Sequence, residues 1–344
     1  MEPFWCAAKR RLGQKEYELT VLCVGLAAPA FPQVPGTEAA PRLSVCVCER
    51  CLSAANRATT PAGGMPAATA MMASSLVADR VLGALFGLLI ADALAMPTHW
   101  FYGGARQVLA EYGSAIKGYV QPNKRLAGSI MNKSSTGGGG RGDASGDVIG
   151  SVICHGKKPF WAPNESNHYH CTLKAGENTL EAQLCRLLAR TITKDKGTFH
   201  ASSFREAYAN FMTTPGSHND CYCSTCHRMF FANMKRGLPL EQCPDNDGHN
   251  VDTIDGLSLP TVVSLASARK SRTDSDRDVT ECVRVTRNSP SLEAAAIAWN
   301  GAVRAVVNDN RSTKEAVREA CDGSPEFRAI AAQVASGRYQ PVVS

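Results

Sequence analysis

A long apolar stretch that begins after Ser74 or Ser75 and stops at Pro97 constrains this chain more than any other feature. Its longest uninterrupted apolar run, Val81 to Ala91, spans eleven residues, which are too few to cross a bilayer. Asp92 closes that run, and Ser74 or Ser75, just before the apolar stretch, can serve as the N-cap of a helix. Small residues between the large ones let neighbours approach closely. The pattern predicts a central helix of a soluble core that ends at Pro97.

Helical periodicity recurs along the rest of the chain, and strand-like alternation is nearly absent. In residues 178–193, Leu180, Leu184, Leu187 and Leu188 fall on one face of a helix. The pattern predicts an all-α fold, a bundle of several helices joined by polar turns. The other segments with this spacing are residues 204–212, 226–237, 258–270, 279–287, 291–308 and 313–321.

The chain divides into a tail and one domain. Residues 1–72 are rich in Ala, Pro and Thr and show no sustained period, which is typical of a disordered low-complexity tail. Residues 73–344 form the predicted helical domain. Within it, residues 132–147 include four consecutive glycines and are expected to form a surface loop or disordered insert. No strand precedes these glycines and no Gly-Lys-Ser/Thr follows, which disfavours a phosphate-binding loop.

The charge of the chain argues against some partners. The net charge is +6, from 37 basic and 31 acidic residues, whereas nucleic-acid binding usually shows clustered Lys and Arg on a far more basic domain. We therefore predict no nucleic-acid partner and no membrane partner. Residues 20–31 follow several basic residues, but Glu16 and Glu18 lie directly before them, which disfavours a signal peptide. We expect a cytoplasmic protein, with organelle import or secretion as the alternative.

The 14 cysteines include two clusters with the same spacing. A Cys-x2-Cys pair is a zinc half-site, so one hypothesis is a structural zinc module. The other is a set of reduced thiols, because a buried free cysteine packs like a small hydrophobe and the scattered remainder favours a reducing compartment. The clusters are Cys46, Cys48 and Cys51, and Cys221, Cys223 and Cys226 with His227.

Two candidate sites combine carboxylates with other polar groups. Asp92 lies within an apolar helix, where a carboxylate is costly unless it is paired or bonded to nearby groups. Further along, His168 and His170 precede Glu177, Asn178 and Thr179, which stand where a helix begins. Side-chain oxygens at this position can cap the helix, or they can bind a hard cation such as Mg²⁺.

A third candidate is the acidic segment 244–260. It begins like part of a calcium loop, but the spacing of a calcium-binding hand is not met. The segment could be a polar connection that caps the next helix, or it could line a site, since acids and a histidine cluster there. Its polar residues include Asp245, Asn246, Asp247, His249, Asn250, Asp252 and Asp255.

Three blocks of the sequence together resemble one family. They are GALFGLLIADALAMPTHWFY, HYHCTLKAGENTLEAQL and CHRMFFANMKRGLPLEQCPDNDGHNVDTIDGLSLP, in that order. They are similar to the ADP-ribosylglycohydrolase family, and within it to the jellyfish J-crystallin branch. The resemblance covers about residues 74–335. It implies an all-α fold and a hydrolase that uses two Mg²⁺ ions to cleave the bond at C1 of an ADP-bound ribose.

The resemblance also implies roles for individual residues. The family's first metal motif, Thr-Asp-Asp-Thr, falls on residues 176–179, where Glu177 keeps the charge of one Asp and Asn178 loses that of the other. We expect Glu177 and Asp92 to be catalytic and ADP-ribose or an ADP-ribosylated molecule to be the substrate. The expected metal ligands are Glu177, Asn178, Thr179, Asp252 and Asp255, and the expected substrate-binding residues are His168, His170, His249 and Asn250.

The chain departs from the family pattern at its second metal motif, Asp-x-Asp-Thr. Residues 250–253 resemble this motif superficially, but in the family it lies near the C-terminus, and residues 322–344 contain none. We expect the closing helices of the family fold to be missing or replaced by this short ending. A site that has only a few carboxylates binds divalent cations weakly. The alternative to a hydrolase is therefore a catalytically impaired, J-crystallin-like structural or binding protein.

Overall fold

The computed structural model of the chain describes residues 67–323, apart from residues 102, 132–147, 163–164 and 249–250. Its regular elements are all helices, with no strand among the described residues, which confirms the predicted all-α class. The expected tail lies almost wholly outside the described residues, as does the Gly-rich segment. The helices are α4 (Ala67–Ala95), α5 (Gly104–Tyr112), α6 (Leu180–Lys194), α7 (Ala201–Thr213), α8 (Thr225–Lys235), α9 (Ser258–Ala266), α10 (Arg272–Thr286), α11 (Pro290–Asp309) and α12 (Thr313–Asp322), with short 3-10 turns between some of them.

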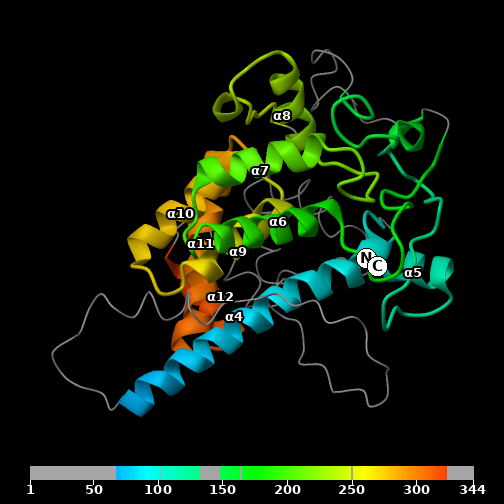
Figure 1. Cartoon of the computed structure of the whole chain (residues 1–344). Coiled ribbons are helices and arrows are strands. Elements are labelled where there is room, and N and C mark those ends of the chain that lie inside the picture. Colours follow the sequence, from blue (N-terminus) through cyan, green and yellow to red (C-terminus); the bar gives the residue numbers. More distant parts are fainter. Residues whose placement is uncertain (1–66, 102, 132–147, 163–164, 249–250, 324–344) are drawn as a thin grey trace.

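Helix α4 carries the apolar stretch and ends where the sequence predicts. It begins at Ala67, before the expected N-cap, and at Ala95 it passes into a 3-10 turn that contains Pro97. The prediction of a central helix is wrong among the described residues. One side of α4 packs on α6, α9 and α11 (Figure 1). The side chains of Leu82, Phe86 and Ile90 on this helix are exposed.

By length and composition alone, residues 75–98 could cross a membrane. A core helix passes the same test, and α4 does pack against other helices of the chain. The expectation of no membrane partner therefore stays a prediction.

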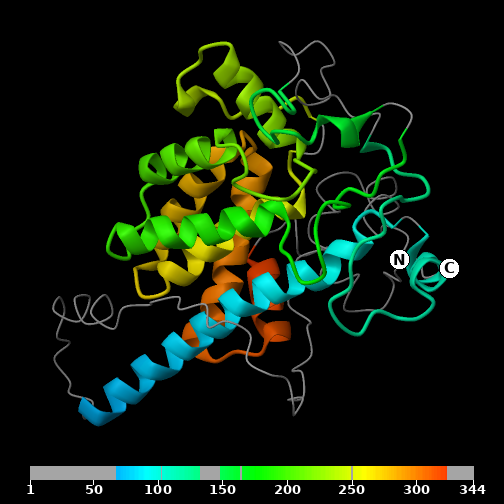
Figure 2. The same ribbon diagram turned by 45° about the vertical axis from the view of Figure 1, so that its right-hand side comes forward.

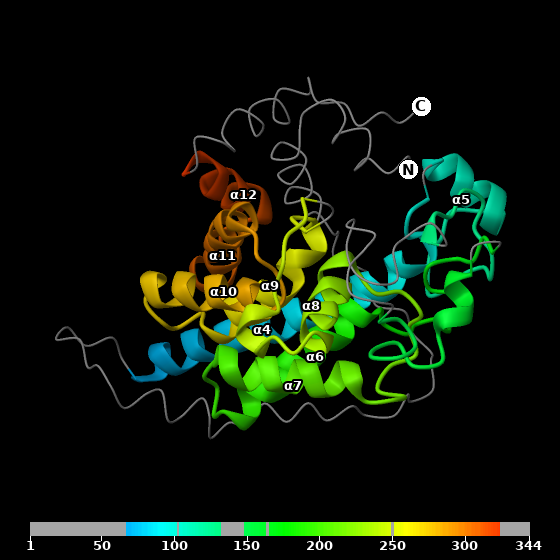
Figure 3. The ribbon, with the colours of Figure 1, turned by 90° about the horizontal axis from the view of Figure 1, so that it is seen from above.

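The centre of the bundle is α9 instead. This helix packs against α4, α6, α10 and α11, and six of its nine residues are buried. A helix that neighbours cover on several sides needs apolar residues all round, which the sequence SLPTVVSLA largely supplies. Helices α10, α11 and α12 complete this part of the bundle and lie at the opposite end of the molecule from α5 (Figures 2 and 3).

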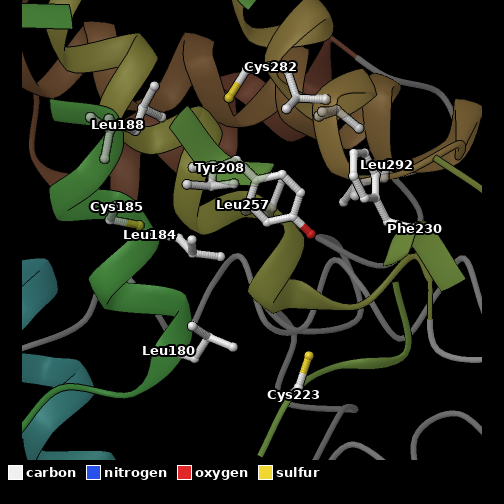
Figure 4. Packing of buried hydrophobic residues seen from close by; sticks show 14 of the residues in the cluster. Leu180, Leu184, Cys185, Leu188, Tyr208, Cys223, Phe230, Leu257, Cys282 and Leu292 are labelled. Carbon is white, nitrogen blue, oxygen red and sulfur yellow. The ribbon is translucent and has the colours of Figure 1, made fainter. Parts of the chain in front are cut away.

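Helix α6 lies between α4 and α7 and turns its leucine face to the core. Leu180 and Leu184 point toward Tyr208 of α7 and Leu257 of the turn before α9 (Figure 4). All of these side chains are at most 5% exposed. The N-terminus of α6 lies next to the C-terminal end of α4. Part of the irregular segment between α5 and α6 lies near the same place (Figure 1).

We predict that Leu184→Ala lowers the free energy of unfolding by about 3 kcal/mol, because it leaves a cavity in a fully buried position. Urea denaturation followed by circular dichroism measures the change. The control is Leu109→Ala at a position that is 52% exposed, where we expect a change of less than about 0.5 kcal/mol. Similar small changes in both variants would show that α6 is not packed as described.

Candidate functional site

The first turn of α6 is held by two carboxylates that come from distant parts of the chain. The backbone N–H of Thr179 donates to Asp92 Oδ2 at 2.8 Å, and that of Leu180 donates to Asp220 Oδ2 at 2.9 Å. Amides at a helix start have no partner within the helix, and the helix dipole favours negative charge there. Asp92 and Asp220 therefore satisfy groups that the helix itself cannot.

Asp92 also binds the side chains of the predicted motif. Its Oδ1 accepts from the Thr179 hydroxyl at 2.6 Å, and its Oδ2 accepts from Asn178 Nδ2 at 3.0 Å. The same amide donates to the carbonyl of Leu89 in α4 at 2.7 Å. Thr179 occupies the N-cap position, yet its hydroxyl binds Asp92 rather than its own helix. The structure thus brings together Asp92, Asn178 and Thr179.

Burial raises the pKa of Asp92 above its usual range, although the hydrogen bonds from Thr179 and Asn178 oppose the shift. These hydrogen bonds come from neutral groups. No salt bridge to Asp92 occurs among the described residues, so its charge is balanced by these dipoles and, through space, by His170.

Glu177 lies beside this group and is half-buried. Its Oε2 accepts from the backbone N–H of Lys174 at 2.8 Å, and its Oε1 accepts from Asn219 Nδ2 at 2.9 Å. Gly176 precedes it with φ +80°, a left-handed conformation that glycine adopts without a steric penalty. This turn fixes the carboxylate next to Asn178, at the surface rather than in the core.

A second buried group consists of Asp220, His170 and His99. His170 Nδ1 lies 2.9 Å from Asp220 Oδ1, and His170 Nε2 lies 2.5 Å from His99 Nδ1. The two imidazole planes differ by 17° and their centroids are 4.8 Å apart, so the rings meet edge to edge. Asp220 and His99 are functional candidates that the sequence prediction missed.

The charges in this group shift the pKa values of its two histidines in opposite directions. Burial alone would lower the pKa of His170, but the charge of Asp220 and the hydrogen bond to it raise that pKa overall. Burial and the neighbouring histidines lower the pKa of His99 well below its usual range. These shifts favour an ionised Asp220, a protonated His170 that donates from both nitrogens, and a neutral His99 that accepts at Nδ1.

The two histidines that we expected to bind substrate have their ring nitrogens engaged inside the protein. His168 is fully buried, with its Nε2 3.0 Å from the carbonyl of Pro97 and its Nδ1 accepting from the backbone N–H of His170. His170 binds Asp220 and His99. Both residues therefore hold the loop in place, and neither ring offers a nitrogen to a ligand.

A third network contacts α6 at Glu181. This carboxylate accepts from the hydroxyl of Ser224 and from His227 Nε2, the latter at 3.0 Å. His227 Nδ1 lies 2.6 Å from the Tyr208 hydroxyl. Burial would lower the pKa of His227, but Cys226 and Glu181 raise it to about 10. A protonated histidine with both nitrogens engaged is not a zinc ligand, which disfavours the zinc hypothesis at the second cysteine cluster.

The acidic segment joins this third network rather than Asp92. Asp255 Oδ2 accepts from Arg287 Nη2 at 2.5 Å and lies 3.4 Å from the Ser224 hydroxyl. Burial would raise the pKa of Asp255, but the guanidinium of Arg287 lowers it overall. Asp252 approaches the Ser291 hydroxyl at 3.5 Å. His249 and Asn250 lie outside the described residues.

No group of three or more His, Cys, Asp or Glu side chains is arranged to hold a metal ion in the part of the chain that the structure describes. The nine described cysteines are all free thiols. Cys46, Cys48 and Cys51 lie outside that part.

The family model for ADP-ribosylglycohydrolases matches residues 73–342, which include Asp92 of α4 and the whole of α6. The chain belongs to the ADP-ribosylglycohydrolase family. In these comparisons no curated protein and no solved structure matches the chain. Asn178 and Thr179, two of the residues that the sequence resemblance placed on the family's first metal motif, contact Asp92 at the start of α6.

The salt bridge between His170 and Asp220 predicts a pH-dependent stability. The pKa of His170 is raised above 6.5, so its contribution is complete below that pH and is lost as pH rises through the folded-state value. The pKa of Asp220 is lowered below 3.8, so its contribution is lost only in stronger acid. We expect Asp220→Asn to lower the free energy of unfolding by about 3 kcal/mol near pH 6, and by less near pH 9.

Urea denaturation at the two pH values measures this effect. Asp309→Asn, at the exposed end of α11, is the control and should change stability by less than about 0.5 kcal/mol at both. An Asp220→Asn penalty that grows toward high pH would contradict the assigned ion pair.

Proposed function

We propose that this chain is a Mg²⁺-dependent hydrolase that cleaves the glycosidic bond at the ribose of an ADP-ribosyl group. Its substrate is then ADP-ribose linked to another molecule. The observation that carries the proposal is the meeting of Asp92 with Asn178 and Thr179, because the family resemblance assigns metal binding to this helix start. Glu177 adds a second carboxylate beside them.

The donor chemistry of this group fits one magnesium ion. Asp92 and Glu177 offer carboxylate oxygens, Asn178 an amide oxygen and Thr179 a hydroxyl, and Mg²⁺ prefers such hard oxygen ligands. Asn178 uses its Nδ2 for Asp92 and Leu89, which leaves its Oδ1 available as an acceptor. When bound, the ion would supply positive charge that orients ribose hydroxyls and polarises a water molecule.

We assign separate roles to the side chains around the proposed metal site. Glu177 is half-buried and held by Asn219 and the Lys174 amide, so we assign it as the base that takes a proton from the attacking water. Asp92 is a metal ligand that also positions Asn178 and Thr179. Among the three histidines, we assign substrate contact to His99, because His168 and His170 are engaged within the protein.

Asp252 and Asp255 do not fit a second ion. The guanidinium of Arg287 already neutralises Asp255, and its positive charge would repel a nearby dication. We therefore confine the proposed metal site to the four residues from α4 and the start of α6, and we derive no catalytic step from a second magnesium ion.

The alternative is a J-crystallin-like structural or binding protein that keeps the family fold without hydrolysis. One observation favours it: both oxygens of Asp92 and both oxygens of Glu177 already accept hydrogen bonds from the protein. Under this alternative the polar group at the start of α6 only stabilises the fold, and magnesium has no role.

Calorimetric titration of the full chain with ADP-ribose, with and without Mg²⁺, distinguishes the hydrolase proposal from the structural alternative. The hydrolase proposal predicts binding that needs Mg²⁺ and that weakens at least about tenfold in Glu177→Gln, which loses a metal-binding charge. Glu206→Gln, on the exposed side of α7, is the control and should bind like the unchanged protein. No heat from the folded protein under either condition would overturn the hydrolase proposal and favour the structural one.

We also propose a cytoplasmic location. The nine described cysteines are free thiols, and such a set is typical of a reducing compartment.

A further inference from the structure

Two segments that carry the His170–Asp220 pair lie alongside each other and make several successive contacts. The Thr172 hydroxyl donates to the carbonyl of Asn219 at 2.7 Å, and His170 binds the next residue, Asp220, at 2.9 Å. Beside these contacts, and one residue beyond Asp220, Cys221 Sγ lies 3.7 Å from Cys171 Sγ. The bonds next to the thiol pair therefore hold its two segments together.

The two thiols differ in their access to solvent. Cys171 is half-buried, whereas Cys221 is fully buried and donates to the carbonyl of Tyr169 at 3.1 Å. A disulfide has an S–S distance of about 2.05 Å, so closing the bond requires the sulfurs to approach by roughly 1.6 Å. Rotation of two cysteine side chains supplies movements of this size.

The pKa values of the two thiols are shifted in opposite directions. The contact with Cys221 lowers the pKa of the Cys171 thiol, while the same contact and burial raise the pKa of Cys221. The thiolate is the reactive form of a cysteine, so we expect Cys171 to be the thiol that attacks an external disulfide. Cys185 and Cys282, by contrast, are buried thiols whose pKa values burial raises.

We propose that Cys171 and Cys221 form an oxidisable dithiol that exchanges with small-molecule disulfides such as oxidised glutathione and closes into an intrachain disulfide. The Cys171 thiolate attacks one sulfur of oxidised glutathione, and one glutathione leaves as its thiolate. Cys221 Sγ then attacks the mixed disulfide at Cys171, and the second glutathione leaves. The protein loses two hydrogens and two electrons, and oxidised glutathione gains them as two thiols.

The disulfide would join the residues that directly follow His170 and Asp220. It would therefore tether the two segments that place Asp220 on the first turn of α6, independently of whether the chain hydrolyses ADP-ribosyl bonds. The proposal stands on the thiol geometry alone and survives a failure of the proposed function.

Peptide mapping of the full chain tests the proposal. The reduced protein is incubated with oxidised glutathione, blocked with an alkylating reagent and digested with trypsin without reduction. We expect a linked peptide that joins residues 158–174 to residues 206–228 and that disappears when a reductant is added. Because residues 206–228 hold three cysteines, the protein used is the Cys223→Ser/Cys226→Ser variant beside the unchanged chain.

Three further variants make the outcome decisive. Cys221→Ser should abolish the linked peptide and leave glutathione on Cys171, while Cys282→Ser should leave the linked peptide unchanged. Thermal unfolding supplies a second readout: oxidation should raise the melting temperature of the unchanged protein but not that of Cys171→Ser. A linkage of residues 142–157 to residues 206–228 instead, or glutathione that stays on Cys171 in the unchanged chain, would overturn the proposal.

Discussion

The amides at the start of α6 need acceptors, and two buried carboxylates supply them. Asp92 comes from α4, and Asp220 comes from the segment before α8, so this single helix start fastens three parts of the chain together. An unsatisfied buried amide costs free energy, and the dipole of α6 makes a carboxylate the most favourable partner. The candidate site exists because these segments meet at that point.

The acidic groups around α6 differ in how their charges are balanced. Asp220 has His170 as a cationic partner, and Asp255 has Arg287. Asp92 has only neutral donors, and burial raises its pKa, whereas the pKa values of Asp220 and Asp255 are lowered. Of these three carboxylates, Asp92 is the one without a salt-bridge partner among the described residues, although the charge of His170 still acts on it.

The sequence predicts α6 to α12 from their periodic patterns and α4 from its apolar run, but it does not predict α5 (Gly104–Tyr112). It also predicts that Asp92 and the residues 177–179 matter, since a carboxylate in an apolar helix and oxygens at a helix start are visible locally. It does not reveal Asp220 or His99. Each lies in a short segment without periodicity, and their roles depend on contacts across 50 and 71 residues of chain.

The prediction for α4 shows a second limit. Small residues along a helix permit close neighbours but do not say whether any are present. Apart from its own helix, nothing among the described residues lies within 4 Å of the position that a Cβ on Gly83 or Gly87 would take, whereas four helices surround α9. Likewise, the acidic segment at residues 244–260 is visible in sequence, but its pairing with Arg287 depends on tertiary packing.

Hydrogen exchange of the backbone amides of Thr179 and Leu180, resolved by residue, tests the central claim most directly. The account predicts that both amides are protected in the unchanged protein. Asp92→Asn should weaken the protection of Thr179, and Asp220→Asn should weaken that of Leu180, because each amide donates to that one carboxylate. Exchange of both amides in the unchanged protein as fast as in an open loop would contradict it.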